Sequence, residues 1–143
     1  MKRYMALDVG SVRIGVAVSD PLAITAQGIA VIPMTKWREK LQVLVNKYSP
    51  HYFVIGLPIR TSGEMGPEVE RVKLFSHEVR SVYPDIDIYF YDERYSSKIA
   101  HQVLDESNVS AKNRRGNVDS IAAAVFLQGF LDSIRRTGNN DPS

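Results

Sequence analysis

The sequence contains no cysteine, so disulfides and thiolate metal ligands are excluded, and a metal ion would need oxygen or imidazole ligands. It also lacks any apolar run near the ~20 residues that a membrane-spanning helix needs. The first acid, Asp8, comes too early for a secretory signal peptide. The net charge of +2 is too small to indicate a polyanionic partner by itself. These absences predict a cytoplasmic protein with no membrane partner.

The length of 143 residues suits one domain with a buried core and is too short for two. We expect a single domain over residues 1–134 and a flexible polar tail over 135–143. Apolar patterns predict strands at 4–8, 14–19, 27–32, 52–57 and 88–91. They predict helices at 37–48, with Thr35 as N-cap, and from Pro67 onward. A third helix is expected at 97–104, capped by Ser96 or Ser97, and a fourth from Val118, after a loop at 110–117. An antiparallel start followed by strands that are entered through helices predicts an α/β fold, with a mixed sheet flanked by helices.

Acidic residues stand at the ends of two predicted strands. Asp8 ends an apolar strand and is followed by Gly10, at the kind of position where α/β sheets place their chemistry, although Asp and Gly also favour plain turns. Asp92 and Glu93 end a later strand. Because neighbouring side chains on a strand point to opposite faces, only one of these two can join a cluster with Asp8. The alternative is a surface ion pair with Arg94, which would contribute little.

Asp119 lies in the last predicted helix, three residues before Ala122 and seven before Phe126, so it shares their apolar face. A carboxylate on a buried face is costly unless it is paired, hydrogen-bonded or bound to a metal. The alternative is an acid placed favourably in the first turn of a helix. Burial with the apolar face favours a functional role for Asp119.

Acids that converge from strand ends and a helix repel one another unless a divalent cation neutralises them, and oxygen ligands suit Mg²⁺ or Mn²⁺. Two such ions ~3.5–4 Å apart could support phosphodiester hydrolysis. We therefore predict that Asp8, Glu93 and Asp119 are catalytic and metal-binding, with Asp92 as the alternative acid. Predicted phosphate contacts, which would otherwise be ordinary solvated charges, are Arg13, Arg60, Lys112, Arg114 and Arg115. The three histidines are scattered and are interpreted as structural or surface residues.

These segments resemble the YqgF/RuvX family of pre-16S ribosomal RNA nucleases, also described as Holliday-junction resolvase-like proteins. The resemblance runs from Met5 to about Asp132 and rests on Ala6-Leu7-Asp8-Val9-Gly10, Gly15-Val16-Ala17-Val18-Ser19-Asp20, Thr25-Ala26-Gln27, Val54-Ile55-Gly56-Leu57-Pro58 with Gly63 and Gly66, Asp92-Glu93-Arg94, Val118-Asp119-Ser120-Ile121-Ala122-Ala123 and Leu127-Gln128-Gly129-Phe130-Leu131. It implies a ribonuclease H-like fold with a five-stranded sheet, divalent-metal nuclease chemistry and maturation of the 5′ end of small-subunit ribosomal RNA. The family's acids fall on Asp8, Glu93 (or Asp92) and Asp119. Arg94 would hold a phosphate or orient an acid.

Three other functions compete with the ribosomal nuclease. A junction resolvase would use the same acids on four-way DNA, usually as a dimer, since substrate shape is read by surfaces and not by the catalytic residues. An ATPase of the sugar-kinase and actin type also uses an Asp-x-Gly strand end but needs two lobes. A non-catalytic RNA-binding assembly factor could keep the fold. The expected partners are pre-16S ribosomal RNA or four-way DNA, and ribosomal particles, with the chain acting as a monomer or homodimer.

Overall fold

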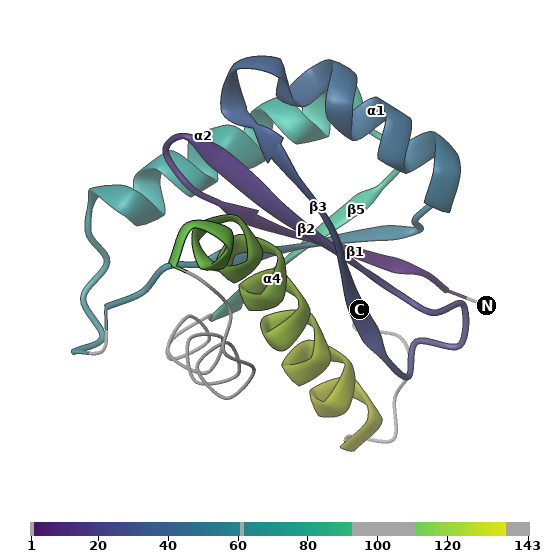
Figure 1. The fold of residues 1–143 in the computed structure, drawn as a ribbon. Coiled ribbons are helices and arrows are strands. Elements are labelled where there is room, and N and C mark those ends of the chain that lie inside the picture. Colours follow the sequence, from purple (N-terminus) through teal and green to yellow (C-terminus); the bar gives the residue numbers. More distant parts are fainter. Residues whose placement is uncertain (1, 61, 93–110, 137–143) are drawn as a thin grey trace.

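The structure is a computed structural model that describes residues 2–60, 62–92 and 111–136, with the side chains of 120–135 described in the last range. The elements, drawn in Figure 1, are β1 (Tyr4–Val9), β2 (Arg13–Ser19), β3 (Ala26–Pro33), the short 3-10 helix η1 (Met34–Lys36), α1 (Trp37–Tyr48), β4 (Tyr52–Leu57), α2 (Pro67–Val82), β5 (Asp87–Asp92) and α4 (Ala111–Arg136). All five predicted strands are present, and Pro67 is the first residue of its helix as predicted.

The five strands form one mixed sheet in the order β3-β2-β1-β4-β5. The pairs β1–β2 and β2–β3 are antiparallel, whereas β1–β4 and β4–β5 are parallel. The central strand β1 is apolar from Tyr4 to Leu7, and these residues have no exposed surface. Such a continuous apolar run suits a strand that is covered on both faces. The predicted mixed sheet with helices on its faces is confirmed.

Helices α1 and α2 lie together on one face of the sheet, and α4 crosses the other face (Figure 1). We call these the α1/α2 face and the α4 face. On the α1/α2 face, Met5 and Leu7 of β1 pack in one cluster with Trp37 of α1 and Phe75 of α2. The two aromatic rings meet edge-on with centroids 4.8 Å apart. This cluster is the larger part of the core.

On the α4 face, the sheet presents Tyr4, Ala6, Ala17 and Val54, and α4 presents the apolar residues Ala123, Phe126, Leu127, Phe130, Leu131 and Ile134. The small side chains of Ala6 and Ala17 let the helix approach the sheet closely. A Cβ atom added to Gly28 of β3 would lie only 2.8 Å from the carbonyl oxygen of Ser120 in α4. Helix α4 therefore packs directly against β3 at Ser120.

One predicted N-cap and one predicted helix start are wrong. The N-cap of α1 is Lys36, not Thr35, because Thr35 is taken up in η1, and no side chain caps the helix. Helix α4 begins at Ala111, so the predicted loop at 110–117 is helical from 111 onward. Residues 111–115 contain good helix formers, and the ~1 kcal/mol cost of one glycine, Gly116, does not end a helix that packs over many turns.

The C-terminal end of α4 is Arg136, two residues into the predicted tail, whose remaining residues lie outside the described ones. The helix predicted at 97–104 also lies outside them. Within the described ranges, no helix is long and apolar enough to cross a bilayer.

Candidate active site at the strand ends

Asp8 is the penultimate residue of β1 and lies opposite Gly15 of β2. Tyr4 and Ala6 belong to the cluster on the α4 face, so the alternation of the strand places Asp8 on that face as well. The carboxylate is half-buried, between the buried residues Leu7 and Val9. Gly15 places no side chain beside Asp8 and is itself buried.

The end of β5 separates two neighbouring side chains. Tyr91 faces α4, where its ring lies 6.4 Å from Phe126 and 6.0 Å from Phe130, centroid to centroid. Asp92 is in register with Leu57 of β4, and Leu57 packs against the cluster on the α1/α2 face. Asp92 therefore lies on the face opposite to Asp8. Glu93, the next residue, is outside the described residues.

Asp119 belongs to α4, one residue before Ser120, whose carbonyl oxygen lies over Gly28. Ala122 and Phe126, which the sequence placed on the same helix face as Asp119, are 2% and 1% exposed. The helix thus brings this position to the α4 face, on which Asp8 lies. The side chain of Asp119 is outside the described ones, and among the described side chains no three Asp, Glu or His come together as a metal site.

Two of the predicted phosphate-binding residues have described side chains. Arg13 begins β2 and is half-buried. Arg60 forms ion pairs with Glu68 at 3.1 Å and Glu64 at 3.4 Å, and the hydrogen bond to Glu68 raises the pKa of Arg60. A phosphate would have to compete with these carboxylates for Arg60. The side chains of Lys112, Arg114 and Arg115, and all of Arg94, lie outside the described residues.

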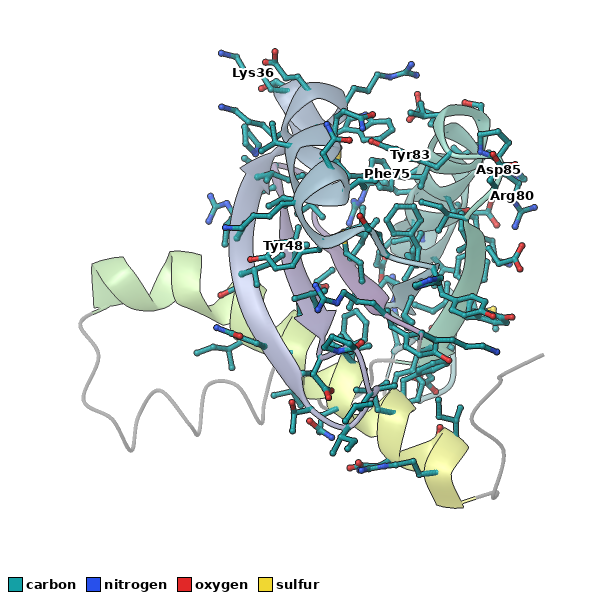
Figure 2. All side chains as sticks on the ribbon, turned by 90° about the vertical axis from the view of Figure 1, so that its right-hand side faces the viewer. Lys36, Tyr48, Phe75, Arg80, Tyr83 and Asp85 are labelled. Atoms are coloured by element: carbon teal, nitrogen blue, oxygen red, sulfur yellow. The ribbon has the colours of Figure 1, made fainter. Side chains whose placement is uncertain are left out.

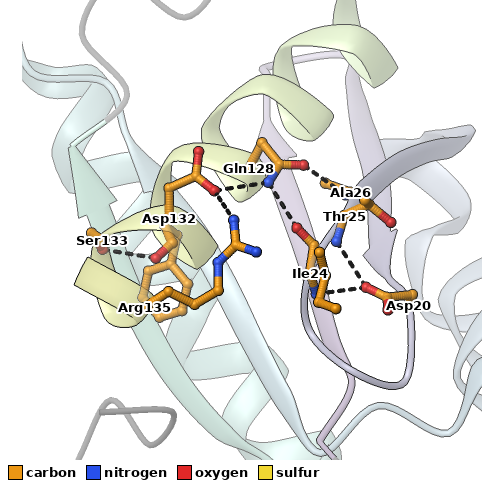
Figure 3. A network of polar contacts seen from close by, with 9 residues as sticks. Asp20, Ile24, Thr25, Ala26, Gln128, Asp132, Ser133 and Arg135 are labelled. Atoms are coloured by element: carbon orange, nitrogen blue, oxygen red, sulfur yellow. Dashed lines mark hydrogen bonds and ion pairs between the residues drawn. The ribbon is translucent and has the colours of Figure 1, made fainter. Parts of the chain in front are cut away.

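The loop between β2 and β3 is held by residues that the sequence analysis did not single out (Figure 3). The carboxylate of Asp20 accepts hydrogen bonds from the backbone N–H groups of Leu22, Ile24 and Thr25. The hydrogen bond from Thr25, aided by those from the other two, lowers the pKa of Asp20 below its usual value, although partial burial acts in the opposite direction. This loop therefore has a fixed, internally bonded shape.

Gln128 ties this loop to α4. Its side-chain oxygen accepts a hydrogen bond from the backbone N–H of Ala26, while its nitrogen donates to the carbonyl oxygen of Ile24 and to Asp132 (Figure 3). The available signal was a glutamine in an otherwise apolar helix segment, which needs buried partners. The bonds fix the position of α4 along the edge of the sheet, and so the position of Asp119.

Residues 2–133 match the model of the RuvX family, which is described as Holliday junction resolvase. The chain belongs to the RuvX family. A protein of Moorella thermoacetica named "Putative pre-16S rRNA nuclease" is 38% identical over 139 residues, which cover 95% of this chain and 99% of that protein. A protein of Roseiflexus sp. with the same name is 38% identical over 136 residues, 93% of this chain and 96% of that one.

Two solved structures resemble this RuvX-family chain in fold. RuvC of T. thermophilus in complex with a Holliday junction substrate has a TM-score of 0.54 and 15% identity, with 95% of this chain and 96% of that chain covered. Fowlpox virus resolvase in complex with Holliday junction DNA has a TM-score of 0.54 and 13% identity, covering 92% and 98%. The fold is ribonuclease H-like, which confirms the predicted fold class.

Proposed function

We propose that this RuvX-family chain is a metal-dependent nuclease that hydrolyses phosphodiester bonds in the 5′ region of precursor 16S ribosomal RNA. The observation that carries the proposal is the position of Asp8. Its half-buried carboxylate lies one residue before the end of the central strand, on the face that is crossed by α4, the helix that contains Asp119. A carboxylate at such a strand end, with no side chain opposite it on Gly15, suits a site that must admit a charged backbone.

The chemistry of the donors fits Mg²⁺ or Mn²⁺. Carboxylate oxygens are the ligands that these ions prefer, and the chain contains no thiolate to select a softer metal. Asp8, Glu93 and Asp119 would hold the metal in this proposal. A divalent metal at such a site supplies activation of water and stabilisation of the leaving oxygen. Arg13, Arg94, Lys112, Arg114 and Arg115 would bind phosphates and offset the repulsion between the acids and a polyanion.

The names of the relatives favour ribosomal RNA as the substrate, and the family description favours four-way DNA as the alternative. The same acids would serve either substrate, because catalytic residues set the reaction and surrounding surfaces select the nucleic acid. If RNA is the substrate, precursor ribosomal particles are the partners we expect.

The test compares the wild type with Asp8→Asn and with Asp85→Asn, an exposed acid far from the site that serves as the matched control. Each protein is incubated with Mn²⁺ or Mg²⁺ and either RNA spanning the 5′ end of precursor 16S ribosomal RNA or a four-way DNA junction. We expect metal-dependent RNA cleavage by the wild type and Asp85→Asn but not by Asp8→Asn. Preferential junction cleavage would replace RNA with four-way DNA as the substrate, and folded protein that is inert on both would refute independent catalysis.

A further inference from the structure

At the end of the sheet opposite to Asp8, the chain forms a basic pocket that none of the proposed catalytic chemistry uses. Arg3 precedes β1, His51 precedes β4, and Tyr48 and Ser49 close α1. A surface pocket of about 420 Å³ is lined by Arg3, Pro21, Tyr48, Ser49 and His51. We call it the Arg3 pocket. Tyr48, which lines this pocket, is labelled in Figure 2 and lies well apart from the labelled acid Asp85.

Two cations gather on one aromatic ring at the pocket. The guanidinium of Arg3 lies 5.8 Å from the centroid of the Tyr48 ring, and the ammonium of Lys47 lies 5.4 Å from the same centroid. Lys2 lies 5.7 Å from the ring of Tyr52 nearby. These distances fall within the range of cation–π attraction. The rings thus collect positive charge at one place on the surface.

The cations on Tyr48 have no carboxylate partner among the described residues, whereas three described arginines do. Arg38, Arg60 and Arg135 each form an ion pair with a carboxylate. Among the described residues, no carboxylate forms an ion pair with Arg3 or Lys47, and Arg3 instead donates to the carbonyl oxygen of Tyr48 at 3.4 Å. An anion bound beside either cation would supply the opposite charge that no described carboxylate supplies.

Asp20, next to the pocket residue Pro21, does not fill this role. Its oxygens accept hydrogen bonds from the N–H groups of its own loop at 2.7, 2.8 and 3.2 Å. They are therefore already committed to holding the loop, and among the described residues Asp20 forms no ion pair with Arg3 or Lys47.

His51 adds a neutral donor to this pocket. Its Nδ1 accepts a hydrogen bond from the backbone N–H of Arg3 at 3.1 Å, and its own backbone N–H donates to the carbonyl oxygen of Arg3 at 2.8 Å. With Nδ1 as the acceptor, the proton of the neutral imidazole is on Nε2, where it is a hydrogen-bond donor. The reciprocal bonds fix the two residues relative to each other. The guanidinium of Arg3 and the imidazole of His51 in the pocket, with the ammonium of Lys47 on the ring of Tyr48, match the acceptor oxygens of a phosphate.

We propose that the Arg3 pocket binds a backbone phosphate of the nucleic-acid substrate, away from the metal-binding acids. This inference rests on the proposed function, because it assigns a second contact to the same substrate. Arg3 and Asp8 are five residues apart along an extended strand, which corresponds to about 17 Å at ~3.3 Å per residue. That is the length of about five base pairs at ~3.4 Å per pair. Tyr48 packs with the cluster on the α1/α2 face, whereas Asp8 lies on the α4 face, so a substrate that touches both sites must pass around the end of the sheet.

A purely structural role for the same cations makes a different prediction. Positive charges near the end of α1 also complement the negative end of the helix dipole. If that were their whole role, removing them would lower the melting temperature and leave the affinity for nucleic acid unchanged.

The binding test uses the Asp8→Asn protein, so that RNA stays intact, and adds Arg3→Gln, Arg3→Lys or Lys47→Gln. Lys73→Gln, an exposed lysine on α2, is the matched control. Loss of one phosphate contact should reduce the slope of log affinity against log salt concentration by about 0.7. At ~0.1 M salt this change corresponds to an affinity for RNA that is about fivefold weaker. We expect this from Arg3→Gln and Lys47→Gln, a smaller loss from Arg3→Lys, and the same affinity and slope at every salt for Lys73→Gln as for Asp8→Asn alone.

A second measurement separates this inference from the proposed function. In protein that keeps Asp8, Arg3→Gln should raise KM and leave the single-turnover rate at saturation unchanged. If the wild type cleaves RNA but Arg3→Gln binds it like Lys73→Gln, the pocket is not a substrate site and the proposed function stands. If the wild type cleaves nothing, the proposed function fails, and the binding series still decides the pocket. Absence of RNA binding by every protein would refute both.

Discussion

The two faces of the sheet are packed with different kinds of side chain. The α1/α2 face is covered by two helices, and its cluster is built from branched aliphatic and large aromatic side chains. The α4 face is covered by one long helix, over a surface of alanines and tyrosines. It is on this second face that Asp8 lies. Among the elements that the structure describes, two helices cover one face and α4 crosses the other, where Asp8 is only partly buried.

On the α4 face, two glycines let the backbone of one element come close to the backbone or an aromatic ring of another. Gly28 lies against the carbonyl oxygen of Ser120, and Gly129 lies against the hydroxyl of Tyr91, each closer than a Cβ atom would allow. The helix on the face with the candidate site is therefore held in position by close contacts at a few points, whereas packing on the α1/α2 face contributes general stability to the fold. The predictions below test that division.

The largest effect is expected from the neighbouring acids Asp92 and Glu93. Glu93→Gln should lower the cleavage rate by more than about 100-fold, because even residues outside the first ligand shell of a metal change activity by 10–100-fold. Asp92→Asn should keep the rate within about threefold, because Asp92 lies on the α1/α2 face. The measurement is the single-turnover rate with Mn²⁺. The reverse pattern would make Asp92 the third acid of the site.

A matched pair of truncations compares the two faces directly. Leu41 of α1 and Leu127 of α4 are both 0% exposed, so Leu41→Ala and Leu127→Ala remove the same atoms from each face. Each should cost about 2–5 kcal/mol in unfolding free energy. At a temperature where both variants are folded, Leu127→Ala should lose more activity, since α4 carries Asp119. Equal loss of activity would mean that the faces do not divide these roles.

A smaller effect is expected at the contact between Gly129 and Tyr91. A Cβ atom at position 129 would lie 2.7 Å from the Tyr91 hydroxyl, so Gly129→Ala should cost about 1–3 kcal/mol through overpacking. Tyr91→Phe removes that hydroxyl, and the next ring atom would be at 3.4 Å, an ordinary contact. The double variant should therefore recover the loss and add up to about 1 kcal/mol from helix propensity. Denaturant unfolding of all four proteins measures the coupling, and additive costs would contradict it.

The smallest effect concerns pH. The folded pKa of Asp20 is below its usual value of 3.8, because backbone N–H groups bond to the charged form. The stabilisation that charged Asp20 gives to the folded state is therefore complete above its usual pKa of 3.8 and is lost as the pH falls through its folded pKa. We expect Asp20→Asn to have a lower melting temperature than the wild type at about pH 6 and a smaller difference at about pH 2.5. A difference that grows in acid would contradict this.

The sequence predicted what depends on local pattern. The apolar run at Tyr52–Leu57 is a buried strand, and Pro67 starts α2, because both signals are contained in a few neighbouring residues. The start of α4 could not be read this way, since Gly116 and the basic residues around it look like a loop unless packing along the whole helix is counted. The face on which Asp92 lies needed the register with Leu57, which is a non-local fact. The same holds for Gln128, whose partners lie on β3 and the loop before it.

The packing of α4 against the first strand has a consequence for how the protein is made. Asp8 is synthesised before the helix that covers its face. Until Ala111–Arg136 have been synthesised, the tyrosines and alanines on that face have no helix to pack against. If Asp8 and Asp119 act together as proposed, the nascent chain gains nuclease activity only when this helix has formed.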